Sequence, residues 1–141
     1  MRIERLSPLV RRRSLRRPLF LAGVRAGFPS PADDYIEQQL DLNEHLVAHP
    51  NSTFFCRAVG DSMHDAGIHD GDLLIVDRSI KPHNGATVIA LIDGEFTVKR
   101  LECRVGGLRL VPANPLYAAI EIEAHHDFEV WGVVTFVVHP L

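Results

Sequence analysis

The sequence predicts a mostly β domain that follows a basic N-terminal arm. Short runs of β-branched and aromatic residues recur between residues 53 and 138, and glycine-containing turns separate them. Residues 34–48 have a helical pattern that is weak at best, and the chain contains no internal repeat. With 141 residues, of which 46% are hydrophobic and 23% charged, we expect one compact domain rather than a disordered chain.

Charge is divided unevenly along the chain. Residues 1–26 contain eight arginines and one glutamate, whereas residues 27–141 carry a net charge of −10. Pro8 and Pro18 interrupt any helix in the first segment, and its clustered arginines repel one another. We therefore expect a mobile basic arm on an acidic body. A transit peptide, an arm that binds nucleic acid and an arm that docks on the acidic body all remain open.

No segment predicts a membrane partner. The longest apolar run is far below the roughly 18 residues that a membrane-spanning helix needs. Residues 18–24 barely reach the apolar length of a secretory signal, and Arg25 follows them directly.

Four runs in the body are predicted to be strands, because each is rich in β-branched, aromatic or other apolar residues. They are residues 53–59, 73–77, 108–111 and 129–138. The strongest local signal is a hairpin at Asp93-Gly94, flanked by two further β-rich runs. This dipeptide tolerates the positive φ angles of a type I′ turn, so we expect a two-residue loop.

The register of this hairpin turns Lys99 inward. A two-residue loop pairs Val88 with Lys99, and side chains alternate between the two faces of a strand. One face then carries Val88, Ala90, Ile92, Thr97, Lys99 and Leu101. The other carries Ile89, Leu91, Phe96 and Val98. Because both faces are apolar, we expect both to be covered, and a desolvated lysine becomes a candidate base near neutral pH. A lysine that extends its head to solvent is the alternative.

Ser62 lies in a glycine-led turn directly after the strand predicted over residues 53–59, in the string Gly-Asp-Ser-Met. Serines in turns are usually caps, and serine is a weak nucleophile without a base in hydrogen-bond reach. A neutral buried lysine can be that base, and Ser–Lys pairs are a known variant of the serine-hydrolase arrangement. Ser62 and Lys99 are therefore the candidate catalytic pair.

Histidines and acidic residues offer competing sites. The side chains that could form a Ser–His–Asp triad or bind a metal are His64, His69, His83, His125, His126, Asp65, Asp70 and Asp72. The GxSxG and HExxH motifs of such sites are absent. Cys56 and Cys103 have no CxxC spacing, and Cys56 is expected to fill the core. We therefore expect neither a metal nor a cofactor.

Four segments, in this order, resemble the UmuD branch of the LexA-like self-cleaving serine peptidases. They are residues 26–31 (AGFPSP), 60–63 (GDSM), 70–72 (DGD) and 93–99 (DGEFTVK). The resemblance extends from about residue 19 to residue 138. It implies a LexA-like catalytic domain with a curled sheet over residues 27–141, and an arm, residues 1–26, that self-cleavage removes.

The resemblance also implies the roles of individual residues. Ser62 would be the nucleophile and Lys99 the general base, and the backbone N–H groups of Asp61 and Ser62 would form the oxyanion hole. The cleaved bond would be Ala26–Gly27. Ala-Gly also occurs at residues 22–23 and 66–67, but only the pair at 26–27 precedes Phe-Pro-Ser-Pro.

Partners follow from the same resemblance. Members of the family are stimulated by RecA on single-stranded DNA during the SOS response. UmuD relatives form homodimers, and their shortened form joins UmuC, the catalytic subunit of an error-prone translesion polymerase in the cytoplasm. The 26 residues before the cleavage site are too few for the helix-turn-helix domain of a LexA repressor. A non-catalytic accessory subunit and a nucleic-acid binder that uses the arginine-rich arm are the alternative functions.

Overall fold

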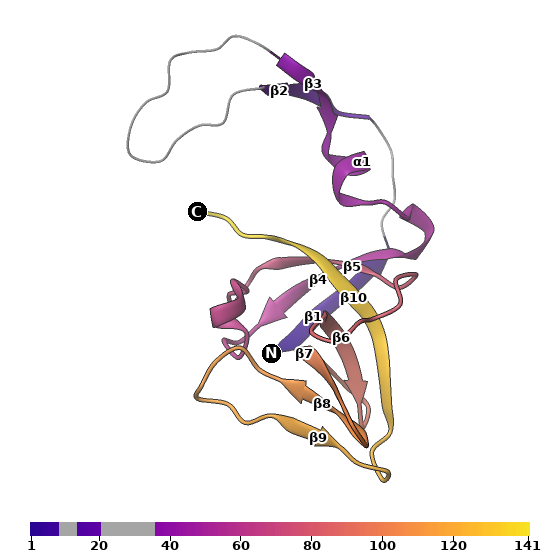
Figure 1. The fold of residues 1–141 in the computed structure, drawn as a ribbon. Helices are drawn as coiled ribbons and strands as arrows, with labels where there is room; N and C mark the ends of the chain where they lie inside the picture. The colour runs from indigo at the N-terminus through magenta and orange to yellow at the C-terminus, as the bar shows by residue number, and fades with distance from the viewer. Residues whose placement is uncertain (9–13, 21–35) are drawn as a thin grey trace. The chain divides into compact units, whose positions relative to one another are not determined.

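Ten strands lie in the part of the chain that the structure, a computed structural model, describes: residues 1–8, 14–20 and 36–141 (Figure 1). They are β1 (Arg2–Pro8), β2 (Arg16–Phe20), β3 (Ile36–Asp41), β4 (Thr53–Val59), β5 (Leu73–Asp77), β6 (Thr87–Ile92), β7 (Glu95–Arg104), β8 (Gly107–Val111), β9 (Ile120–Ile122) and β10 (Phe128–Val138). The helical elements are α1 (Leu42–Leu46) and two 3₁₀ turns, η1 (Pro50–Ser52) and η2 (His64–Ala66). The predicted mostly β fold is confirmed.

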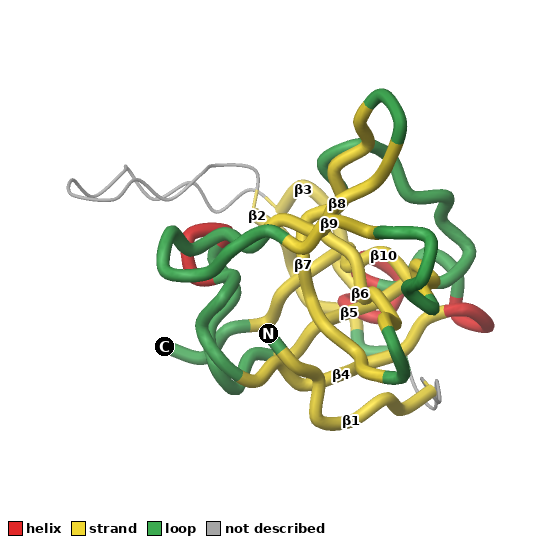
Figure 2. The backbone as a smooth tube through the Cα atoms, turned by 90° about the horizontal axis from the view of Figure 1, so that it is seen from below, coloured by secondary structure: helices red, strands yellow, loops and turns green. Residues whose placement is uncertain are grey.

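The chain divides into two compact units, Met1–Leu9 with His49–Leu141 and Val10–Ala48. The larger unit is built on an antiparallel sheet in the order β1-β4-β5-β10-β6-β7-β8-β9. Strands β1 and β7 contact each other although four strands separate them in this order. The sheet must therefore curl, as the view in Figure 2 shows.

The smaller unit pairs β2 with β3 and continues into α1. Asp41 caps this helix, because its side chain accepts a hydrogen bond from the Asn43 backbone N–H at 2.9 Å. A weak helix over residues 34–48 was the prediction; residues 36–41 form a strand instead, and only five residues are helical. The predicted cleavage site, Ala26–Gly27, lies outside the described residues.

The hairpin of β6 and β7 has the predicted register. Val88 is opposite Lys99, and the turn residues Asp93 and Gly94 have φ angles of 49° and 82°, as a type I′ turn requires. Both faces of the hairpin are buried, as expected. One face contributes Ile89 and Val98 to the first hydrophobic cluster. The other contributes Val88, Ala90 and Leu101 to the second.

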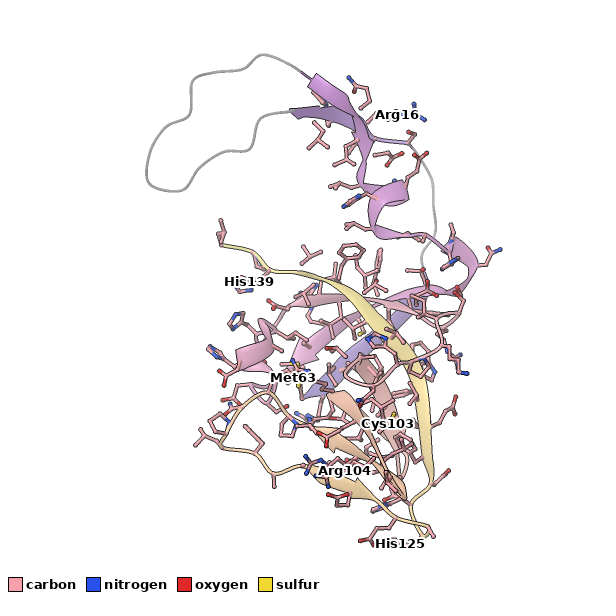
Figure 3. The ribbon with its side chains drawn as sticks, viewed as in Figure 1. Arg16, Met63, Cys103, Arg104, His125 and His139 are labelled. Atoms are coloured by element: carbon pink, nitrogen blue, oxygen red, sulfur yellow. The ribbon has the colours of Figure 1, made fainter. Side chains whose placement is uncertain are left out.

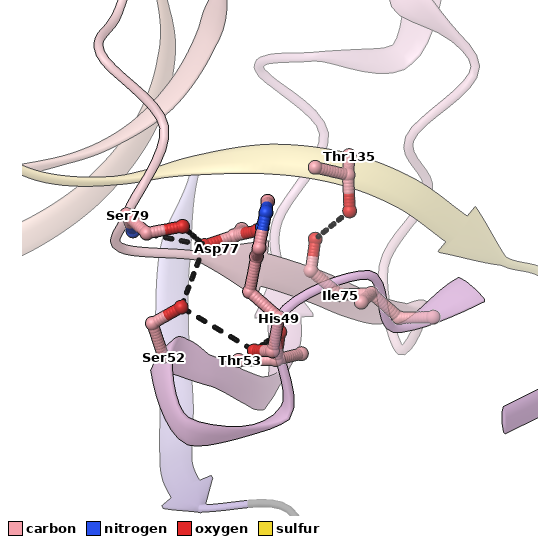
Figure 4. A network of polar contacts seen from close by, with 7 residues as sticks. All are labelled: His49, Ser52, Thr53, Ile75, Asp77, Ser79 and Thr135. Carbon is pink, nitrogen blue, oxygen red and sulfur yellow. Dashed lines mark hydrogen bonds and ion pairs between the residues drawn. The ribbon is translucent and has the colours of Figure 1, made fainter. Parts of the chain in front are cut away.

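A buried carboxylate connects the start of β4 to the end of β5 (Figure 4). Asp77 Oδ1 accepts hydrogen bonds from Ser52 Oγ at 3.0 Å and Ser79 Oγ at 2.7 Å, and Asp77 Oδ2 lies 2.5 Å from His49 Nδ1. Burial alone would raise the pKa of Asp77, but the bonds from Ser79, His49 and Ser52 outweigh it and lower the pKa. Both serine hydroxyls contact the carboxylate, so this network stabilises the fold and is not arranged as a catalytic triad.

Gly132 lies where β10 passes from its pairing with β6 to its pairing with β5. A Cβ at this position would be 2.6 Å from Val76 Cγ1, which is too close for two carbon atoms. We expect Gly132→Ala to lower the free energy of unfolding by about 1–3 kcal/mol, measured by urea denaturation. Gly107→Ala is the matched control, because nothing lies within 4 Å of a Cβ there. Equal stability of the two variants would contradict the prediction.

Candidate active site

The turn that carries Ser62 leaves the end of β4. Gly60 adopts a φ of 101°, and its N–H donates to Asp70 Oδ1 at 2.7 Å, which holds the chain in a sharp turn. Ser62 is 2% exposed, and the fully buried side chain of Met63, labelled in Figure 3, anchors the turn in the core. The serine hydroxyl is thus held inside the protein at the end of the strand.

Lys99 lies on β7, which three strands separate from β4 in the order of the sheet. Its Nζ lies 3.1 Å from Ser62 Oγ, within hydrogen-bond distance. Both residues are buried, with Lys99 6% exposed. The structure therefore brings the two candidate catalytic residues together, although 37 positions separate them in the sequence.

The surroundings of Lys99 favour its neutral form. Its Nζ also donates to Thr97 Oγ1 at 2.9 Å and to the Val98 carbonyl at 3.1 Å, and it contacts no carboxylate among the described residues. Burial lowers the pKa of Lys99 below its ordinary value, and a hydrogen bond with the Met1 amine opposes this effect without reversing it. A deprotonated amine next to a serine hydroxyl can act as its base.

The first residue of the chain also reaches the site. The amino group of Met1 donates a hydrogen bond to Ser62 Oγ. The Met1 carbonyl accepts from the Val98 N–H at 2.8 Å and from Thr97 Oγ1 at 2.9 Å. Burial, and then the neighbouring Lys99, lower the pKa of the Met1 amine to about 5.

The loop after β8 holds the nucleophile turn in place. The Ala113 N–H donates to the Ser62 carbonyl at 2.9 Å, and Asn114 Nδ2 donates to the Asp61 carbonyl at 2.9 Å. The hydroxyl of Tyr117 donates to Asp61 Oδ1 at 2.5 Å, and this bond raises the pKa of the phenol. Three residues of one loop thus fix the backbone and side chain that flank Ser62.

Sequence reasoning missed the contacts of Met1, Thr97, Ala113, Asn114 and Tyr117. Thr97 could have been found, because it precedes Lys99 by two positions on the same strand face. The other four contact the turn from segments that are far away in the sequence, and such contacts leave no local pattern.

The candidate histidines do not contact Ser62. Among the described residues, the hydrogen bonds of Ser62 Oγ come from Met1 and Lys99. The rings of His64 and His69 instead meet edge to face, and the ring of His69 also contacts that of His139, which is labelled in Figure 3. His139 Nδ1 lies 2.5 Å from Asp72 Oδ1. Burial alone would raise the pKa of Asp72, but the bonds from the His69 N–H and from His139 lower it.

The possible metal ligands, the two cysteines and a pocket do not form part of the Ser62–Lys99 site. Within the described ranges, no three His, Cys, Asp or Glu side chains are grouped to hold a metal ion. The thiols of Cys56 and Cys103 are both free; Cys56 is buried, and burial raises its pKa to about 12. A pocket of about 190 Å³ contains no titratable side chain. Its lining residues are Ala66, Ile68, Thr87, Val134, Thr135, Phe136 and Val137.

Comparison with known proteins shows which family the chain resembles. Residues 18–135 match the family model described as Peptidase S24-like. Protein SamA of Salmonella typhimurium is 49% identical over 122 residues, which cover 86% of this chain and 84% of that protein. Protein ImpA of Escherichia coli is 52% identical over 124 residues, or 87% of this chain and 83% of that protein. LexA repressor 1 of Xanthomonas campestris is 44% identical over 113 residues, which are 80% of this chain and 56% of the repressor.

The chain belongs to the Peptidase S24-like family. Within this family it is a UmuD-like protein, as its similarity to SamA and ImpA over most of its length shows. In the residues that the structure describes, no helix has both the length and the apolar character needed to cross a membrane.

Proposed function

We propose that this protein is a self-cleaving serine peptidase that removes its own N-terminal arm at Ala26–Gly27. The observation that carries the proposal is the 3.1 Å separation of Ser62 Oγ and Lys99 Nζ in a buried site. The Peptidase S24-like family supports it independently.

In the proposed reaction, neutral Lys99 takes the proton of the Ser62 hydroxyl while Oγ attacks the Ala26 carbonyl carbon. Lys99 then gives this proton to the Gly27 nitrogen as the Ala26–Gly27 bond breaks, so one group acts as base and then as acid. Water, activated by the same amine, releases Ala26 from Ser62 and returns the hydroxyl.

The negative oxygen formed during the attack needs hydrogen-bond donors. Within the described part of the chain, the backbone N–H groups of Asp61 and Ser62 donate to no acceptor. The loop contacts of Asn114 and Tyr117 hold this turn from outside. We assign the two free N–H groups to the oxyanion hole, where one donor contributes about 2.7–4 kcal/mol to transition-state stabilisation.

The similarity to UmuD-like proteins supports a proposal for the biological role. We propose that the protein takes part in SOS mutagenesis, that RecA on single-stranded DNA stimulates its cleavage, and that the shortened form joins a UmuC-type translesion polymerase as a homodimer in the cytoplasm. A stimulator can act by favouring the conformation in which the arm is docked across Ser62.

The mass of the cleavage product tests the proposed function. We expect purified protein, incubated at pH 9–10, to yield a fragment of residues 27–141 by intact-mass spectrometry. Cleavage at residues 22–23 or 66–67 would give other masses and would correct the assigned bond. A chain that stays full length both at alkaline pH and with a RecA–DNA filament would favour the non-catalytic accessory subunit.

A further inference from the structure

Strand β1 lies along an edge of the large sheet and begins beside the active site. It pairs antiparallel with β4, from Arg2 opposite Val59 to Pro8 opposite Phe54. Because Val59 ends β4 just before the Gly60 turn, this register brings the start of the chain to the nucleophile.

Met1 is held in the way that an extended peptide is held at a sheet edge. Its carbonyl accepts the Val98 N–H and the Thr97 hydroxyl, and its amino group donates to Ser62 Oγ. Its side chain is 9% exposed and packs in the same core cluster as Met63. Backbone hydrogen bonds combined with a filled apolar pocket are the usual means of recognising an added strand.

We infer that residues 1–8 are a self-ligand of the candidate active site, bound on the leaving-group side of Ser62. The Met1 nitrogen lies next to Ser62 Oγ, and the chain that follows it runs along β4. This nitrogen therefore occupies the place of the amine that peptide cleavage releases. The segment around Ala26–Gly27 needs this same place to be cut.

The two segments therefore compete for one place beside Ser62. Both segments belong to the same chain, so a molecule with β1 docked beside Ser62 cannot cleave itself. The cleavage rate is therefore proportional to the fraction of molecules in which β1 is not docked. This inference rests on the proposed function and adds a way in which self-cleavage is regulated.

A disulfide between β1 and β4 tests this competition. Leu6 is opposite Cys56 in the strand register, and directly opposite residues have Cβ atoms close enough for a disulfide after a small adjustment. We combine Leu6→Cys with Cys103→Ser, which removes the exposed thiol, and oxidise with copper phenanthroline. We expect a disulfide, seen as a loss of two mass units, and at least tenfold slower self-cleavage that a phosphine reductant restores. The Cys103→Ser protein, treated in the same way, is the control and should cleave at an unchanged rate.

A binding measurement separates failure of the inference from failure of the proposed function. In the same protein with Ser62→Ala added, a fluorescent peptide of residues 20–34 should bind at least tenfold more weakly in the oxidised than in the reduced state. This difference would support the competition even if no form of the protein cleaved itself. Absence of the disulfide, or equal cleavage and equal peptide binding in both states, would overturn the inference.

A release variant provides the opposite result. Ile3 packs against the first hydrophobic cluster, so Ile3→Asp should loosen β1 without touching Ser62 or Lys99. We expect self-cleavage about five- to tenfold faster, because β1 leaves the place beside Ser62 free in more molecules. Leu15→Asp, at a leucine that is 54% exposed in the other unit, is the matched control. Slower or unchanged cleavage by Ile3→Asp, with its fold intact by circular dichroism, would contradict the competition.

Discussion

Ser62→Ala is expected to abolish self-cleavage at every pH, because the described site holds no second hydroxyl that could replace Ser62 as the nucleophile. Thr97 is also within reach of Lys99, but its hydroxyl donates to the Met1 carbonyl. Loss of a serine nucleophile lowers such rates by about 10⁶-fold, so no product should be seen in intact-mass spectra over days.

Ser52→Ala is the matched control for this prediction. Its hydroxyl is one of several donors to Asp77 and lies outside the candidate active site, so self-cleavage should continue at an unchanged rate. Circular dichroism should show that both variants keep the native sheet. A Ser62→Ala protein that still released residues 27–141 would exclude Ser62 as the nucleophile.

Lys99 should impose a rising pH dependence on self-cleavage. The neutral amine is the active form, so below its pKa the rate should increase about tenfold for each pH unit and level off above it. Because burial lowers this pKa, the plateau should begin below about pH 10.4, the ordinary value for lysine. Rates measured by mass spectrometry from pH 6 to 11 give the profile directly.

Lys99→Met should remove cleavage across this whole range, whereas Lys81→Met changes the chain's other lysine, which is exposed, and should leave the profile intact. Stability gives a second measurement. A lysine with a lowered pKa binds fewer protons in the folded than in the unfolded state, so the free energy of unfolding should rise with pH between the two pKa values. This rise should be absent in Lys99→Met.

A flat rate profile in the unsubstituted protein would rule out Lys99 as the titrating base.

The body of the fold could be predicted from the sequence because its signals are local. The Asp93-Gly94 turn fixes the pairing of Val88 with Lys99, and the strands over residues 53–59 and 73–77 have the predicted bounds. Side-chain alternation placed Lys99 among apolar neighbours but left open a head that extends to solvent. The structure decides between the two, because Lys99 is buried.

The N-terminal strands and β9 were not predicted. Strand β1 contains arginines and ends in a proline, and it becomes a strand only by pairing with a partner about fifty residues away. Strand β9 has three residues, too few to show a periodic pattern. The contacts of Met1 and of the Asn114–Tyr117 loop with the nucleophile turn likewise depend on tertiary structure, which no local motif encodes.

The two-residue turn at Asp93-Gly94 makes the position of the Lys99 amine depend on how many residues lie between the turn and Lys99. An even or an odd change in that number decides which face of β7 carries the amine. Neighbouring positions on β7 face opposite ways, and Arg100 stands directly after Lys99. Deleting one residue between the turn and Lys99 would turn Lys99 and every later residue of β7 to the opposite face, and Arg100 would then stand opposite Val88. Deleting two would return Lys99 to its present face, one step closer to the turn. Insertions and deletions in this short stretch should therefore be far more harmful to the peptidase than most substitutions there.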